Sequence, residues 1–173
     1  LQGSAADPSD RGSSRRSLIE SPTYPNAIAT LEGAGASLVS YPLEIGADGH
    51  YWDLAAMDQA LQRTRIRAAY LIPDFHNPTG ALLPETARGD LGALLRRHSV
   101  TPIIDESLVE LGLEGTPTPT PMAKFVPNSI TAGSTSKIFW GGLRGGWMRI
   151  PRHLIDAMAA VRLSLDLGAP VVE

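Results

Sequence analysis

Short apolar runs of strand length alternate with longer amphipathic patterns along most of this chain, and this alternation restricts the fold more than any other feature. The alternation predicts an α/β fold with three layers, in which a mainly parallel sheet carries helices on both faces. Open sheets of this kind bind ligands at the carboxyl ends of their strands, so the segments that follow the strands are where a site is expected. The strand-sized runs cover residues 18–20, 37–41, 68–72, 102–105, 129–132 and 146–150.

Four helices are predicted between or after these runs. They cover residues 25–32, a segment that starts with Asp53 as N-cap, about residues 84–98, and a segment that follows Pro151. Apolar residues at helical spacing are expected to face the core. These are Leu54, Met57 and Leu61 in the second helix, Leu91, Leu94 and Leu95 in the third, and Leu154, Met158, Val161 and Leu165 in the fourth.

The length of 173 residues suits one domain. Residues 1–16 have few large apolar side chains and are expected to be irregular or disordered, which leaves 17–173 as the domain. Both ends of the chain suggest a fragment of a longer protein. No apolar run approaches the roughly 18 residues of a membrane span. The chain has no Cys, which excludes disulfides and thiolate metal sites and agrees with a cytoplasmic location.

Charge and histidine spacing exclude two other classes of function. The formal net charge is −3 and the basic residues are scattered, so this chain by itself is not expected to bind nucleic acid. Its four histidines show no metal-ligand spacing, and no metal site is predicted.

Three segments that follow strand-like runs carry candidate chemistry. In residues 75–80 (FHNPTG), Asn77 precedes a proline, which keeps Asn77 out of the helical region and fixes a turn. Asp105 ends the apolar run of residues 102–105, beside the expected ligand crevice. Taken alone, each has an ordinary alternative: a turn after a strand for Asn77, and a helix N-cap or a solvated loop acid for Asp105.

The third segment, residues 133–144 (GSTSKIFWGGLR), places Lys137 between hydroxyl groups and an aromatic stretch. Partial desolvation there would lower the pKa of the amine and make it the nucleophile that Schiff-base chemistry needs. Lys124 and Lys137 are the only lysines among 15 basic residues, so the chain otherwise uses arginine for surface charge. The alternative is a solvated loop lysine.

Together these segments resemble, in order, the signature of fold-type I aminotransferases, which depend on pyridoxal 5′-phosphate (PLP). The residues that carry the resemblance are 77–80 (NPTG), 105–106 (DE), 134–137 (STSK) and 142–144 (GLR). Residues 136–144 (SKIFWGGLR) and 165–170 (LDLGAP) are more specifically similar to MocR-type transcriptional regulators of the GntR family, in which an aminotransferase-like domain follows a winged-helix DNA-binding domain. The resemblance covers about residues 17–173.

The resemblance implies a role for each matching residue. Lys137 would form the internal aldimine with PLP, and Asp105 would keep the pyridine nitrogen protonated by a charge-assisted hydrogen bond. Asn77 would donate to the phenolic oxygen of the ring. Tyr24 would stack on the ring face, unless it is only a packed aromatic at a strand end. Three further side chains would hold the phosphate: Ser134, Ser136 and Arg144.

The chain also departs from the family pattern. Aminotransferases usually have a tyrosine three residues after the pyridine aspartate, and this chain has Leu108, which cannot donate a hydrogen bond. The glycine-rich phosphate loop, the small domain with its substrate-carboxylate arginine and a winged helix are all absent from these 173 residues.

Three readings of the function remain open. The chain is predicted to be part of the PLP-binding large domain of a MocR-like regulator, which senses PLP or an amino acid, forms a homodimer in the intact protein and contacts DNA only through another domain. The second reading is an active class I/II aminotransferase, and the third is a truncated chain that binds nothing stably.

Overall fold

A six-stranded sheet organises the chain in the computed structural model, which describes residues 16–113 and 115–165. The strand order is β2-β1-β5-β6-β7-β8, and every pair is parallel except β7 with β8. The parallel strands therefore end at one edge of the sheet. The strands are β1 (Arg16–Ser21), β2 (Ser37–Pro42), β5 (Ala68–Leu71), β6 (Thr101–Asp105), β7 (Ile130–Ser134) and β8 (Gly146–Arg149).

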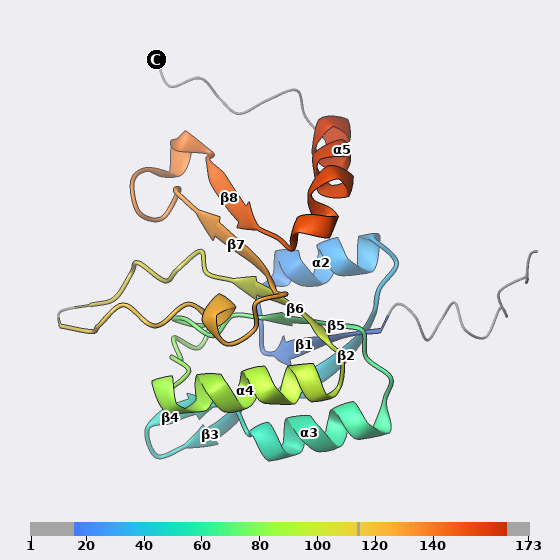
Figure 1. The fold of residues 1–173 in the computed structure, drawn as a ribbon. Coiled ribbons are helices and arrows are strands. Elements are labelled where there is room, and N and C mark those ends of the chain that lie inside the picture. The colour runs from blue at the N-terminus through green and yellow to red at the C-terminus, as the bar shows by residue number, and fades with distance from the viewer. Residues whose placement is uncertain (1–15, 114, 166–173) are drawn as a thin grey trace, which may run out of the picture.

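Helices lie on both faces of this sheet, as Figure 1 shows. One face carries α2 (Pro25–Gly33), and the other carries α3 (Leu54–Arg63) and α4 (Glu85–Arg97). The last helix, α5 (Ile155–Leu165), follows a short 3-10 turn, η3 (Arg152–Leu154). Two more 3-10 turns are η1 (Met122–Lys124) and η2 (Gly141–Leu143). The predicted fold class, a mainly parallel sheet between layers of helices, is confirmed.

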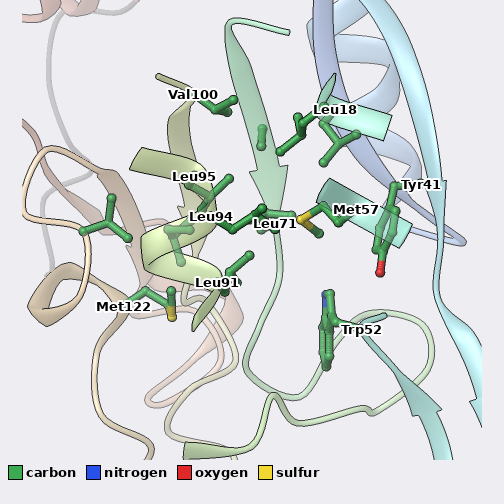
Figure 2. Packing of buried hydrophobic residues seen from close by; sticks show 14 of the residues in the cluster. Leu18, Tyr41, Trp52, Met57, Leu71, Leu91, Leu94, Leu95, Val100 and Met122 are labelled. Atoms are coloured by element: carbon green, nitrogen blue, oxygen red, sulfur yellow. The ribbon is translucent and has the colours of Figure 1, made fainter. Parts of the chain in front are cut away.

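The main hydrophobic core lies between the sheet and the pair α3 and α4 (Figure 2). The alternation within β5 and β6 sends Leu71 and Ile104 to this side, and both are fully buried. The residues predicted to face the core from α3 and α4 pack against this side of the sheet. Met57, Leu61, Leu91, Leu94 and Leu95 are buried, and Leu54 is half-buried and packs against the core. The prediction for these two helices is therefore confirmed.

Asp53 caps α3 as predicted. Its carboxylate accepts hydrogen bonds of 3.0 Å from the backbone N–H groups of Ala55 and Ala56, which satisfies two donors that the first turn leaves without helical partners.

A small antiparallel hairpin was not predicted. It joins β3 (Glu44–Gly46) to β4 (Gly49–Tyr51) and forms a separate two-stranded sheet. Each strand has three residues, of which only His50 is even half-buried, so no apolar alternation reveals the hairpin in the sequence. Gly49 takes a φ of +104° in the turn, a conformation that favours glycine.

The prediction that the last helix buries one apolar stripe is wrong for Val161, whose side chain is 51% exposed. Leu154 and Met158 are only half-buried, and the side chain of Leu165 lies outside the described residues. The reason is that α5 projects beyond the sheet and does not lie flat on it (Figure 1). The stripe therefore does not join the main hydrophobic core.

The expectation of an irregular segment over residues 1–16 falls outside the described residues, except for Arg16, which begins β1. Within the described part of the chain, no helix is both long enough and apolar enough to cross a membrane.

Candidate functional site

One pocket lies at the edge of the sheet where the parallel strands end. Its empty space, including the part that is open to solvent, is about 490 Å³. Four of the seven predicted site residues line it: Tyr24, Asn77, Asp105 and Lys137. They follow or end β1, β5, β6 and β7 respectively, so the sheet topology brings together residues that are far apart in the sequence. Ile72, Ser107 and Leu108 complete the lining.

Asp105 is the last residue of β6 and its side chain is half-buried. One carboxylate oxygen, Oδ2, accepts a hydrogen bond of 2.6 Å from the hydroxyl of Tyr70. The other, Oδ1, accepts one of 2.9 Å from the backbone N–H of Ser107. Burial, and then the hydrogen bond to Asp105, raise the pKa of the Tyr70 hydroxyl well above its usual range, so the hydroxyl keeps its proton and remains a donor.

The turn that carries Asn77 is held by its own backbone and by a buried histidine. His76 is 1% exposed, its N–H donates to Ala81 O over 2.8 Å, and its Nδ1 lies 2.9 Å from the hydroxyl of Thr79. Gly80 closes the turn with a φ of +73°, which explains why a glycine occupies this position. Asn77 itself is exposed beside the pocket.

Glu20, which the sequence reasoning missed, lies behind this turn and is 1% exposed. Its two carboxylate oxygens accept hydrogen bonds from Trp52 Nε1 over 2.6 Å and from the Ile72 N–H over 2.9 Å. Nε2 of His76 lies 3.2 Å from Oε2 of the same carboxylate. Glu20 ends the apolar part of β1 just as Asp105 ends β6, so the argument applied to Asp105 could have found it.

Lys137 was predicted to be partly desolvated, but its side chain is exposed. The aromatic stretch after it does not cover the amine: Ile138, Phe139 and Trp140 are 45%, 74% and 69% exposed. The segment leaves the end of β7 as a turn that points away from the core. Thr135 anchors it, since its N–H and its hydroxyl both donate to Gly145 O, over 3.1 and 2.8 Å.

The three residues predicted for phosphate binding are not among those that line the pocket. Ser134 ends β7, and its hydroxyl accepts a hydrogen bond of 3.2 Å from the N–H of Ser136. Arg144 is exposed and follows η2 with a φ of +50°. Ser136 and Arg144 lie on the loop that carries Lys137, and Ser134 immediately precedes this loop.

Tyr24 lines the pocket from the loop between β1 and α2, and it is 37% exposed. The side-chain amide of Asn26 donates a hydrogen bond of 2.8 Å to its hydroxyl. Tyr24 also borders a second, apolar hollow under α2, which it shares with Tyr70. The ring therefore stands between the two hollows and is not packed into the core.

A second buried charged cluster lies away from the pocket. The Arg88 side chain is fully buried and pairs with the fully buried carboxylate of Asp74. Burial raises the pKa of Asp74. Burial also raises the pKa of Glu106, and the negative charge of Asp74 raises it further. Across the described residues, no group of three or more His, Cys, Asp or Glu side chains could hold a metal ion.

The sequence profile of "Aminotransferase class I and II" matches residues 12–165, which is most of the chain. The chain belongs to the class I and II aminotransferase family. This family is PLP-dependent, and the resemblance drawn from the lysine segment and the strand-end residues is confirmed.

Similar proteins of known sequence include transaminases and transcriptional regulators. The chain is 31% identical over 159 residues to a 2-aminoadipate transaminase from Thermus thermophilus, a match that covers 90% of this chain and 39% of that protein. It is 28% identical over 154 residues to the HTH-type transcriptional regulator YisV from Bacillus subtilis, covering 88% of this chain and 31% of the regulator. The chain thus spans less than half of the length of each of these relatives, 39% and 31% respectively.

Solved structures agree with the family. The α-aminoadipate aminotransferase LysN from Thermus thermophilus matches with a TM-score of 0.75 and 30% identity, over 90% of this chain and 40% of LysN. N-Succinyldiaminopimelate aminotransferase from Mycobacterium tuberculosis matches with a TM-score of 0.79 and 28% identity, over 87% of this chain and 40% of that enzyme.

Proposed function

We propose that this chain holds PLP in the pocket at the strand ends, with Lys137 as the covalent anchor. The observation that carries the proposal is that an amine, a carboxylate, an amide and an aromatic ring line one pocket although they come from four separate strand ends. Asp105 offers its carboxylate to the protonated ring nitrogen, Asn77 its amide to the phenolic oxygen and Tyr24 its ring to the cofactor face.

The donor set suits the cofactor chemically. PLP, when bound, supplies an electron sink for negative charge that develops on the carbon next to an attached amino nitrogen. Asp105 would keep the proton on the ring nitrogen, and its two existing hydrogen bonds leave lone pairs on both oxygens for that contact. Ser134, Ser136 and Arg144 belong to the proposal as phosphate ligands, because they lie at the end of β7 and in the loop that carries Lys137.

In the intact protein, this domain would be the effector-sensing part of a MocR-type transcriptional regulator. Residues 17–173 would form part of the large domain of a cytoplasmic homodimer, and DNA would be contacted only by a winged-helix domain outside this chain. Two observations support this reading: several relatives are HTH-type regulators, and Leu108 lines the pocket with an aliphatic side chain where aminotransferases usually have a tyrosine donor.

An active aminotransferase is the second candidate, and the similarity to a 2-aminoadipate transaminase favours it. In that case Lys137 would also move a proton between the substrate Cα and the cofactor. A chain that binds no cofactor remains the third reading.

Kinetics on the intact protein separate the first two candidates. An amino acid added to the PLP-loaded protein together with 2-oxoglutarate should change the cofactor spectrum without sustained formation of glutamate. Turnover at ordinary enzymatic rates, about 1 per second or faster, would favour the aminotransferase. A gel shift of the intact protein that depends on PLP would support the regulator, and a salt-sensitive shift by residues 17–173 alone would contradict it.

A further inference from the structure

The hydroxyl of Tyr70 reaches Asp105 from the side of the apolar hollow under α2. Tyr70 lies on β5 opposite Ile103 of β6, and Asp105 lies two residues further along β6, on the same face. This arrangement lets the tyrosine reach diagonally across the strand pair and donate to Oδ2 of Asp105 over 2.6 Å. Tyr70 does not line the pocket that Asp105 lines. It therefore contacts the carboxylate from behind.

Each oxygen of Asp105 has its own donor. Ser107 N–H donates to Oδ1 over 2.9 Å, and Tyr70 donates to Oδ2. Two donors on different oxygens fix the rotation of a carboxylate plane, whereas one donor leaves it free to turn. The Tyr70 hydroxyl supplies this contact at every ordinary pH, because burial and the neighbouring carboxylate raise the pKa of its phenol.

The orientation of Asp105 matters because it is the only acidic side chain among those that line the pocket. Leu108 and Ile72 line the same pocket with apolar side chains. A ligand with a protonated ring nitrogen therefore depends on the carboxylate of Asp105 for its ionic contact at this end. A hydrogen bond of this kind loses strength steeply when its acceptor is misaligned.

We propose that Tyr70 is a positioning residue, which holds the Asp105 carboxylate in the orientation in which it accepts the N–H of a protonated nitrogen heterocycle. The proposal rests on the proposed function, with the PLP pyridine ring as that heterocycle. In metal sites, removal of a group that orients a ligating side chain changes affinity by about 10–100-fold, and we expect the same kind of effect here. Removal of the Tyr70 hydroxyl should act at the lower end of that range, because Ser107 still holds one oxygen.

Tyr41 provides a matched control. Its hydroxyl also donates a hydrogen bond of 2.6 Å, in this case to the backbone oxygen of Asp53 at the start of α3. Tyr41 is 2% exposed and does not line the pocket. Tyr41→Phe therefore removes the same chemical group and a bond of the same length without touching Asp105.

The test is a PLP titration of the intact protein, followed by absorbance, together with thermal unfolding in the absence of PLP. Tyr70→Phe should weaken PLP binding about tenfold. Tyr41→Phe should lower the unfolding temperature yet leave the PLP dissociation constant within about twofold. A double-mutant cycle distinguishes positioning from a merely structural role. In an Asp105→Ala background, Tyr70→Phe should no longer change the PLP affinity.

Two results would overturn the inference alone: unchanged PLP affinity in Tyr70→Phe, or the same loss of affinity with and without Asp105. Absence of saturable PLP binding by the unmodified protein would overturn the proposed function and the inference with it.

Discussion

Replacing Arg88 with methionine should destabilise the fold strongly, because the guanidinium satisfies several buried acceptors at once. It donates to Thr120 O over 3.0 Å, to Leu83 O over 3.1 Å and to the carboxylate of Asp74. The side chains of both Arg88 and Asp74 are fully buried. The substitution fills a similar volume but leaves the Asp74 charge without a cation.

The expected loss follows from that buried charge. Breaking a buried ion pair by removing one partner costs about 3–5 kcal/mol, a large share of the roughly 5–15 kcal/mol that stabilises a typical domain. Part of the loss can be avoided by protonation, since burial already raises the pKa of Asp74. Arg88→Met should therefore be less destabilising at acidic pH than at pH 7. A double variant with Asp74→Leu, which removes both charges, should recover most of the stability.

Urea denaturation of the intact protein without cofactor measures this effect, and Arg97→Met provides a matched control. Arg97 pairs with Asp58 over 2.8 Å, but its side chain is 61% exposed. Loss of a solvated pair should leave the denaturation midpoint almost unchanged. The reasoning would be refuted if the two variants shifted the midpoint equally, or if the Asp74→Leu double variant were less stable than Arg88→Met alone.

Three further predictions concern other parts of the chain. Burial raises the pKa of Glu106, so the folded state binds the proton of this carboxyl more tightly than the unfolded state does. The stability of the fold should therefore fall as the pH rises from about 4.3, the usual pKa of a glutamate, through the raised pKa. Glu106→Gln should flatten this fall in thermal melts recorded at a series of pH values. Gly92→Ala should lower the unfolding temperature despite the better helix propensity, since the added Cβ would lie 3.0 Å from Cβ and 3.1 Å from the backbone oxygen of Phe125; a higher temperature in a circular dichroism melt would contradict this. Trp52→Phe should cost about 1–3 kcal/mol in chemical denaturation, because it removes a donor from the buried carboxylate of Glu20, and an unchanged midpoint would argue against that hydrogen bond.

Residues at the ends of strands were predictable from the sequence, because an acid or a turn that follows an apolar run lies at the carboxyl end of a strand in a parallel sheet. Asp105 and Asn77 are of this kind, and the structure brings both to one pocket. The N-cap role of Asp53 was equally predictable, since it depends on residues two and three positions away. Local patterns carry this information.

Partners that come from distant segments were not predictable in the same way. Tyr70 meets Asp105 across 35 residues of sequence, and Trp52 meets Glu20 across 32. Nothing in the local sequence of Tyr70 distinguishes it from a packed strand aromatic. Burial also depends on distant segments: Lys137 is exposed in spite of its apolar neighbours, because the described residues place no other element over its loop.

Trapping of the cofactor on a lysine tests the central claim most directly. The intact protein would be incubated with PLP, reduced with borohydride, which makes a lysine–pyridoxal linkage permanent, and digested for peptide mapping. Lys124→Ala is the matched control, because Lys124 is the only other lysine among these residues. The account predicts a label on Lys137 that survives in Lys124→Ala and disappears in Lys137→Ala. A label that follows Lys124, or a saturated reaction that leaves Lys137 unmodified, would contradict it.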